Sequence, residues 1–324
     1  MADEAPVSED RVEPGVRRFV REVNAAFAAE AGGRELSQDE ARAAAERVRA
    51  PWRQGGPVMA TTRDAQVGTP YGSVRVRLYV PAGVAAAAPA LIYMHGGGWT
   101  LFSVDTHDRL MREYAHRAGL VVIGVDYSRS PEVRFPVALN EVVAVVDWAR
   151  KGGAGAEVDP ERLALGGDSA GGNLALAAAL KLRDAGRGDE TKGLLLNYGA
   201  FDTAVDEAAG QVWGGPDYML ETDEMRQFWR NYLAVEADAA DPLAVPARAA
   251  LHGLPPAFFT VAECDILAEQ NEALCRRMAE AGGRARTVVY RGATHSFLEA
   301  VSVSTLADRA LQDGADWLRE TLTA

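Results

Sequence analysis

The feature that most constrains the fold is a regular alternation, from Ala90 to the C-terminus, of short apolar segments with longer segments rich in helix formers. The apolar segments, which we predict to be strands, are Ala90–Met94, Leu120–Val125, Arg162–Leu165, Gly193–Asn197, Ala257–Val261 and Arg286–Tyr290. The predicted helices are 106–118, 136–150, 170–184, 267–281 and 304–320. Strands without polar positions must be covered on both faces. The pattern therefore predicts an α/β fold with a mostly parallel central sheet, about eight strands in all, flanked by helices.

The N-terminal part of the chain has a different periodicity. Residues 14–50 carry the amphipathic spacing of helices. From Val58 the period changes to two, and Thr69–Gly72 has the composition of a turn before the alternating strand Val74–Val80. This region is expected to add a hairpin to the sheet.

An insertion interrupts the alternation after Asn197. Residues 201–250 contain no predicted strand and are rich in aromatic residues. An insertion at the C-terminal end of a strand lies where open α/β folds place their ligands. We therefore predict a helical cap, built from residues 1–50 and 201–240, on a main domain of residues 51–324. A surface helical excursion with its own aromatic core is the alternative.

The composition argues against several classes of partner. A net charge of −12 disfavours nucleic acid and anionic membranes. Residues 1–10 are acidic and lack the apolar region of a signal peptide, and the longest apolar run, Val84–Met94, is too short to span a bilayer. The 2 cysteines, Cys264 and Cys275, are expected to be buried free thiols, which suits a cytoplasmic protein.

The pentapeptide Gly167-Asp168-Ser169-Ala170-Gly171 has the pattern G-x-S-x-G and lies between a predicted strand and a predicted helix. The flanking glycines allow a sharp turn that would hold the Ser169 hydroxyl above the sheet, at the N-terminus of the helix. A serine nucleophile needs this placement. The pentapeptide alone also occurs by chance, so other residues have to support the interpretation.

A second motif, His95-Gly96-Gly97-Gly98-Trp99, directly follows the strand Ala90–Met94. Consecutive glycines can turn backbone N–H groups toward one point, as the stabilisation of an oxyanion requires. We predict that the N–H groups of Gly97, Gly98 and Ala170 form an oxyanion hole. A flexible turn is the alternative, but it would require neither the histidine nor the tryptophan.

A serine nucleophile also needs a base and a carboxylate that orients the base. Of the 5 histidines, His295 follows the last predicted strand, where α/β-hydrolases place their base. The carboxylate should come between Ser169 and His295 and follow a strand. Asp265 fits this position best, although it could instead cap the next helix, and Glu263 and Asp202 are the other candidates. The sequence thus predicts Ser169 as nucleophile, His295 as base and Asp265 as the orienting acid.

Taken together, these motifs resemble the hormone-sensitive-lipase-like branch (family IV) of the α/β-hydrolases, in particular bacterial acetyl esterases. The likeness runs from about Ala90 to the C-terminus and includes residues 105–109, 126–132, 197–199, 241–242 and 254–256. It implies the α/β-hydrolase fold with a helical cap, the triad above, and hydrolysis of short-chain acyl esters without a cofactor. No cysteine or histidine spacing typical of a metal site is present, so no metal is expected.

The substrate is expected to be a small-molecule ester with an acetyl to butyryl acyl group. Bulky rings near the nucleophile would shorten the acyl pocket. The candidates for contact with substrate are Trp99, Phe102, Trp213, Tyr218 and Trp229, whose alternative role is packing inside the cap.

Two other functions remain open. An amide or N-acyl hydrolase, of the arylacetamide deacetylase or formamidase kind, would use the same triad. A non-catalytic ligand-binding α/β-hydrolase would lack the base, and His295 argues against it. We expect activity to rise through a pKa near ~6.5 as His295 loses its proton. A homodimer through the strand Arg286–Tyr290 and the last helix is a further expectation.

Overall fold

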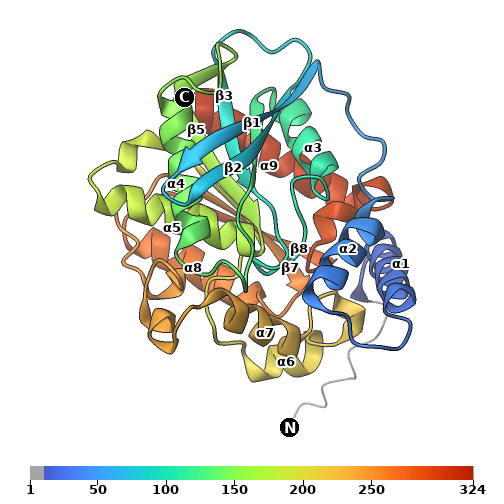
Figure 1. The fold of residues 1–324 in the computed structure, drawn as a ribbon. Coiled ribbons are helices and arrows are strands. Elements are labelled where there is room, and N and C mark those ends of the chain that lie inside the picture. The colour runs from blue at the N-terminus through green and yellow to red at the C-terminus, as the bar shows by residue number, and fades with distance from the viewer. Residues whose placement is uncertain (1–10, 324) are drawn as a thin grey trace.

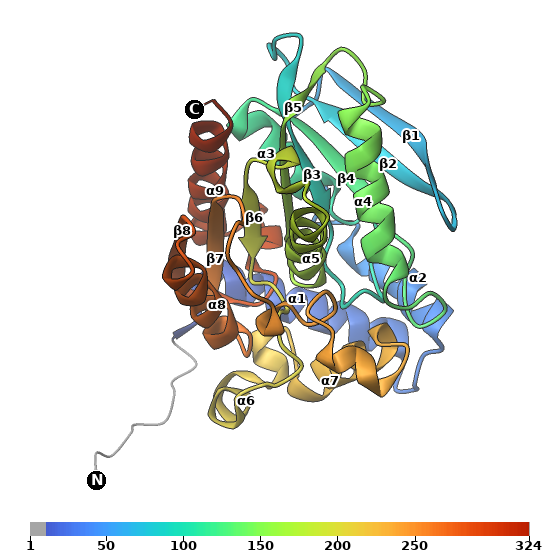
Figure 2. The ribbon, with the colours of Figure 1, turned by 90° about the vertical axis from the view of Figure 1, so that its left-hand side faces the viewer.

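The computed structural model describes residues 11–323, which form an eight-stranded sheet in the order β1-β2-β4-β3-β5-β6-β7-β8 (Figures 1 and 2). The strands are β1 (Thr61–Thr69), β2 (Gly72–Val80), β3 (Ala88–Met94), β4 (Val121–Asp126), β5 (Val158–Asp168), β6 (Leu194–Asn197), β7 (Ala257–Cys264) and β8 (Ala285–Thr294). The pairs β1–β2 and β2–β4 are antiparallel, and all other pairs are parallel. The predicted α/β architecture is therefore confirmed. Residues 1–10, with the acidic segment and the start of the predicted cap, lie outside the described residues.

Helices cover both faces of the sheet. The long helices are α1 (Pro14–Ala31), α2 (Gln38–Arg49), α3 (Asp108–Ala118), α4 (Val137–Arg150), α5 (Ala170–Asp184), α6 (Glu207–Trp213), α7 (Thr222–Tyr232), α8 (Ala268–Glu280) and α9 (Thr305–Thr323). One core cluster joins the sheet to α4, α5 and α8, and a second joins it to α3 and α9 (Figure 2). Successive residues of β3 alternate between the two clusters, since side chains alternate across a strand. No helix within residues 11–323 combines the length and apolar character needed to cross a membrane.

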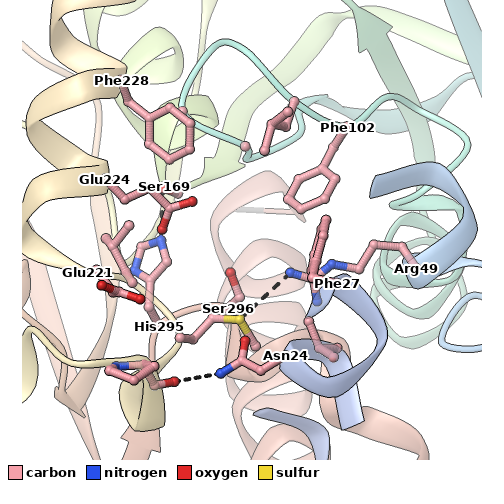
Figure 3. Close-up of a pocket in the computed structure, with 17 residues that line it drawn as sticks. Asn24, Phe27, Arg49, Phe102, Ser169, Glu221, Glu224, Phe228, His295 and Ser296 are labelled. Carbon is pink, nitrogen blue, oxygen red and sulfur yellow. Dashed lines mark hydrogen bonds between the residues drawn. The ribbon is translucent and has the colours of Figure 1, made fainter. Parts of the chain in front are cut away.

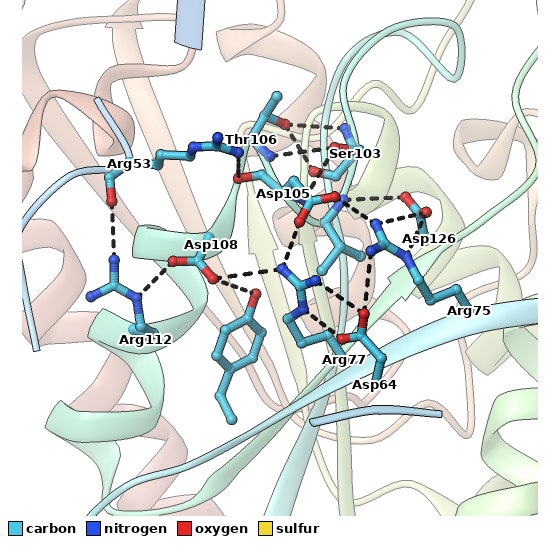
Figure 4. Close-up of polar contacts among 12 residues, drawn as sticks. Arg53, Asp64, Arg75, Arg77, Ser103, Asp105, Thr106, Asp108, Arg112 and Asp126 are labelled. Atoms are coloured by element: carbon cyan, nitrogen blue, oxygen red, sulfur yellow. Dashed lines mark hydrogen bonds and ion pairs between the residues drawn. The ribbon is translucent and has the colours of Figure 1, made fainter. Parts of the chain in front are cut away.

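Ion pairs attach the β1–β2 hairpin to the loop that precedes α3 (Figure 4). Arg77 contacts Asp64 of β1 and Asp105 of that loop, each at 2.6 Å. Arg75 contacts the same Asp105 at 2.7 Å and Asp126, at the end of β4, at 3.1 Å. The two arginines therefore hold the loop between β3 and α3, which contains the glycine motif, against the sheet.

The helices of the predicted cap gather beyond the C-terminal ends of the parallel strands. Figure 1 shows α1 and α2 at the right of this end and α6 and α7 below it. The two groups meet where Asn24 Nδ2 of α1 donates to the Pro216 carbonyl at 2.6 Å. At the start of α2, Ser37 and Glu40 form a capping box. The N-terminal helices and the insertion thus lie side by side, although they are far apart in the chain.

Candidate active site

The serine of the pentapeptide sits in a strained turn between β5 and α5. Ser169 has φ 54° and ψ −118°, a conformation that side-chain-bearing residues seldom adopt. The neighbouring glycines permit the close packing of this turn. A Cβ on Gly171 would lie 2.0 Å from the Met94 carbonyl oxygen, and one on Gly167 would lie 2.4 Å from the backbone of Gly171. The turn is therefore built on a close approach of the α5 N-terminus to the end of β3.

The predicted triad residues come together. The Ser169 hydroxyl lies 2.9 Å from His295 Nε2, and His295 Nδ1 lies 2.7 Å from Asp265 Oδ2. All three side chains are buried. The other oxygen of Asp265 accepts from the Leu267 N–H at 2.9 Å, so this carboxylate also caps the turn into α8. With Nδ1–H directed at Asp265, the Nε2 atom is left to accept the Ser169 proton.

The rival carboxylates have other partners. Glu263 Oε2 accepts from the Gly292 N–H at 2.9 Å, and its other oxygen lies 3.3 Å from Arg11. Asp202 accepts from the Ala204 N–H within its own loop. Asp265 is the carboxylate that contacts the base.

The pKa of His295 is raised above its usual value. Burial lowers this pKa, but the charge of Asp265 and its hydrogen bond to the ring favour the protonated form more strongly. Tyr198 adds an edge-to-face contact, with ring centroids 5.1 Å apart. The base is thus held in one orientation and has an increased proton affinity.

The glycine loop presents free backbone donors beside Ser169. Gly97 has φ 107° and Gly98 has φ 58°, and both line the same cavity as Ser169. Within the described residues, the N–H groups of Gly97 and Gly98 have no hydrogen-bond acceptor. A Cβ on Gly98 would lie 2.1 Å from the ring of Phe228, which packs directly against the loop. These donors and the Ala170 N–H, at the first position of α5, are the three groups that the sequence analysis predicts for the oxyanion hole.

A second acid–histidine pair lies directly behind the nucleophile. Asp168 accepts from the Tyr93 hydroxyl at 2.9 Å and lies 3.3 Å from His107 Nε2. Thr106 Oγ1 donates to the Ser103 carbonyl and lies 2.9 Å from His107 Nδ1. Burial lowers the pKa of His107, but the charge of Asp168 and its hydrogen bond to the ring raise this pKa by more, so the net shift is upward.

His95 supports the glycine loop from within. Its Nδ1 lies 2.7 Å from the Gly96 carbonyl, and its ring stacks on Tyr127 with centroids 4.4 Å apart. Burial, together with the nearby charge of His107, lowers the pKa of His95 to about 4, so this ring is neutral. It braces the loop and has no hydrogen bond with the triad serine.

A cavity of about 480 Å³ opens above Ser169 and His295 (Figure 3). Its walls combine residues of the glycine loop with residues of α1, α2 and α7. Its polar lining beyond the triad comprises Asn24, Arg49, Glu221, Glu224 and Ser296. Its apolar lining comprises Val23, Phe27, Leu101, Phe102, Pro216, Met219, Leu220 and Phe228. Among the described residues, no group of three or more His, Cys, Asp or Glu side chains is arranged to hold a metal ion.

The five aromatic residues predicted to contact substrate differ in their position relative to the cavity. Phe102 lines the cavity, but Trp99, Trp213, Tyr218 and Trp229 do not. The Trp99 ring is fully buried, stacked on Tyr232 at 4.2 Å and tilted against Trp229 at 4.6 Å. Trp213 and Tyr218 form an edge-to-face pair in the insertion, at 5.0 Å. Trp229 thus packs α7 against Trp99 of the glycine loop, while Trp213 and Tyr218 pack against each other within the insertion, in line with the alternative role.

Other residues line the cavity that the sequence did not single out as site residues. Phe27, Phe228, Arg49 and Glu224 all come from the cap helices. Glu224 and Phe228 are four residues apart on α7, a spacing that places both on one side of a helix. This spacing could have indicated a shared face, but not which face turns toward the cavity.

The two cysteines are buried free thiols, as expected. Burial raises the pKa of Cys264 to about 12 and also raises that of Cys275. Neither thiol belongs to the cavity lining.

Comparison with known proteins identifies the family. The profile of the α/β-hydrolase fold family matches residues 91–299. The chain is 38% identical to the acetyl esterase of Salmonella agona strain SL483 over 266 residues, 82% of this chain and 81% of that protein. It superposes on the hyperthermophilic esterase from the archaeon Pyrobaculum calidifontis with a TM-score of 0.88 at 29% identity, covering 97% of this chain and 100% of that one. The thermostable carboxylesterase EstE1, cloned from a metagenomic library, gives a TM-score of 0.84 at 33% identity. This superposition covers 89% of this chain and 98% of that one. The chain belongs to the α/β-hydrolase fold family and, within it, to the hormone-sensitive-lipase-like branch that its motifs resemble.

Proposed function

We propose that this protein is a serine carboxylesterase that hydrolyses small esters with acetyl to butyryl acyl groups. One observation carries the proposal: the hydrogen-bonded series Ser169–His295–Asp265 opens into a cavity beside backbone N–H groups that have no partner within the described chain. Both an acyl acceptor and a stabiliser for the oxyanion are thus present at one place. The curated acetyl esterases at 38% identity support an ester as the substrate over an amide.

The geometry supports a two-step reaction. Ser169 Oγ attacks the acyl carbon while its proton passes to His295 Nε2, and the carbonyl oxygen becomes an oxyanion held by the N–H groups of Gly97, Gly98 and Ala170. The imidazolium then gives its proton to the alcohol oxygen, and the alcohol leaves an acyl-enzyme behind. His295 next takes a proton from water while the water oxygen attacks the acyl carbon, and the imidazolium then returns this proton to Ser169 Oγ as the carboxylic acid leaves. Asp265 stabilises the charged ring during both steps.

The cavity walls support a short acyl group. Phe228 packs on Gly98 and Phe102 lines the wall beside the glycine loop, so bulky rings adjoin the oxyanion donors. These two residues take the role that the sequence analysis gave mainly to tryptophans. We therefore expect kcat/KM to decrease progressively as the acyl chain grows beyond butyryl.

Cellular location and assembly are part of the same proposal. Two buried free thiols suit a reducing cytoplasm. β8 is an edge strand of the sheet and α9 is the last helix, so a homodimer would form along this edge.

The proposal is tested on purified protein with p-nitrophenyl esters from acetate to dodecanoate, beside an acetanilide. We expect kcat/KM to be highest for acetate or butyrate and to fall for the dodecanoate, with much slower release of aniline. Ser169→Ala should abolish turnover of every ester. Full esterase activity in Ser169→Ala, or faster hydrolysis of the anilide than of the ester, would overturn the assignment.

A further inference from the structure

A buried guanidinium forms part of the cavity wall. Arg49 is the last residue of α2 and is only 2% exposed, yet it lines the cavity that contains Ser169. Its guanidinium carbon lies 4.8 Å from the ring centroid of Phe102 and 5.1 Å from that of Phe19. The two rings therefore fix the position of the charged group. In Figure 3 it extends into the cavity from the wall across from Ser169 and Glu224.

The N–H donors of the Arg49 guanidinium make few hydrogen bonds with the described residues. Nε and Nη1 of Arg49 have no hydrogen-bond acceptor among the described residues. Nη1 makes an ion pair with Glu299 Oε1 at 3.4 Å, and Nη2 donates only to the thioether sulfur of Met219 at 3.9 Å. An arginine carries five N–H donors, and buried donors nearly always find an acceptor. A fixed, buried group with unused donors at the wall of a substrate cavity is suited to bind an acceptor oxygen of a ligand.

The surrounding charges determine which kind of oxygen fits. Glu299 already balances the charge of Arg49, and Glu221 and Glu224 line the same cavity. The walls of the cavity surround Glu224, whose side chain is still open to solvent through the cavity mouth. This enclosure, together with the nearby charge of Glu221, raises the pKa of Glu224 to about 7. A carboxylate on the substrate would face these acidic groups without an unpaired cation to offset them. An uncharged acceptor oxygen would need no further charge.

We propose that Arg49 binds an uncharged acceptor oxygen of the substrate, such as an ether, hydroxyl or second ester oxygen, away from the bond that is cleaved. This inference rests on the proposed esterase function and specifies its substrate class. The enzyme acts on short-chain esters whose alcohol or acyl part carries a further oxygen, in preference to esters of plain hydrocarbons. The displaced partner of Arg49 is the Met219 sulfur, a weak acceptor that costs little to lose.

The experiment uses pairs of esters that differ by one oxygen in place of a methylene group. 2-Methoxyethyl acetate and butyl acetate place the oxygen in the alcohol, and ethyl 3-methoxypropanoate and ethyl pentanoate place it in the acyl group. Each ratio of kcat/KM is divided by the ratio of the hydroxide-catalysed rates, which removes the intrinsic difference in reactivity. For at least one pair we expect roughly a tenfold preference for the oxygen-bearing ester, the effect of one hydrogen bond to a charged donor. Arg49→Met should reduce the corrected ratio to about one.

Two further variants separate recognition from a structural role of Arg49. Arg47→Met removes an exposed arginine of the same helix, which pairs with Glu30 outside the cavity, and should leave the ratio unchanged. Glu299→Gln leaves the Arg49 charge unbalanced. It should therefore raise kcat/KM for monoethyl succinate, which carries a carboxylate, relative to kcat/KM for ethyl pentanoate. This result does not depend on the folding of Arg49→Met.

The inference is overturned if wild-type corrected ratios are near one for both pairs, if Arg49→Met keeps the preference, or if the wild type prefers monoethyl succinate. A wild type that hydrolyses none of these esters, nor p-nitrophenyl acetate, would instead contradict the proposed esterase function.

Discussion

At the scale of single residues, the contact between Asp265 and His295 sets the pH range of activity. Because Asp265 raises the pKa of His295 above the ordinary ~6.5, more of the base is protonated at neutral pH. A protonated ring cannot accept the Ser169 proton, so kcat/KM should fall as the pH falls through a pKa above ~6.5. Asp265→Asn removes the charge, so the fall of kcat/KM on the acid side of the pH–rate profile should occur at lower pH. This variant should also reduce kcat about 10³–10⁴-fold. Rate profiles from pH 5 to 9 measure both effects.

Asp202→Asn is the matched control, since Asp202 is a candidate for the same role and its carboxylate accepts from the Ala204 N–H within its own loop. It should keep the wild-type profile. An Asp265→Asn profile with an unmoved acid limb would contradict the assignment of the triad.

The residues of the triad could be predicted because each follows a strand that the sequence reveals, and because local motifs mark Ser169 and the glycine loop. The cavity walls could not be predicted in the same way. Trp99 directly follows the glycines, yet its positive φ of 57° and its stacking on Tyr232 direct the ring into the protein. Phe228 is distant in sequence and packs on Gly98. Such contacts depend on how cap and sheet dock, which local patterns do not encode.

At the scale of elements, the junction of β3, β5 and α5 is the most tightly packed part of the site. A Cβ on Gly171 would lie within 2.0 Å of a backbone oxygen of Met94, which cannot move without shifting β3. We expect Gly171→Ala to lower the free energy of unfolding by about 1–3 kcal/mol, as overpacked sites do, and to lower kcat because Ser169 moves. Urea unfolding and ester hydrolysis measure the two effects. Gly68→Ala in β1, where a Cβ meets nothing within 4 Å, should change stability by less than ~0.5 kcal/mol.

The elements themselves were largely predictable, and the differences lie at their ends. β5 is expected over Arg162–Leu165 but runs from Val158 to Asp168, because Val158 already pairs with Ala88 of β3 across a bulge and Asp168 pairs with Asn197 of β6. β8 likewise continues to Thr294, where it pairs with Cys264. Apolar periodicity locates the buried middle of a strand. The ends extend into less apolar sequence because hydrogen bonding to a neighbouring strand, and not burial, holds them.

At the scale of the whole molecule, stability in acid should depend on the arginine network that attaches the hairpin to the main sheet. Hydrogen bonds from Arg77 hold the pKa of Asp64 below its usual value. Burial raises the pKa of Asp105, but the hydrogen bonds from Arg75 and Arg77 lower this pKa by a larger amount, so the net shift is downward. A carboxylate whose pKa is lowered by folding stabilises the fold above its unfolded pKa, near ~3.9, and this contribution is lost as the pH falls through the folded pKa.

We therefore expect Asp105→Asn to lower the free energy of unfolding by about 1 kcal/mol at pH 7, since the ion pairs are partly exposed. The difference from wild type should stay constant down to about pH 5 and shrink below about pH 4, where the wild-type carboxylate itself becomes protonated. Urea unfolding of both proteins at several pH values between 3 and 7 measures this. Asp217→Asn, an exposed carboxylate of the insertion, is the control and should follow wild type throughout. A deficit in Asp105→Asn that is equally large at pH 3 would mean that the side chain acts through packing, and that the charges of the network contribute nothing to holding the hairpin.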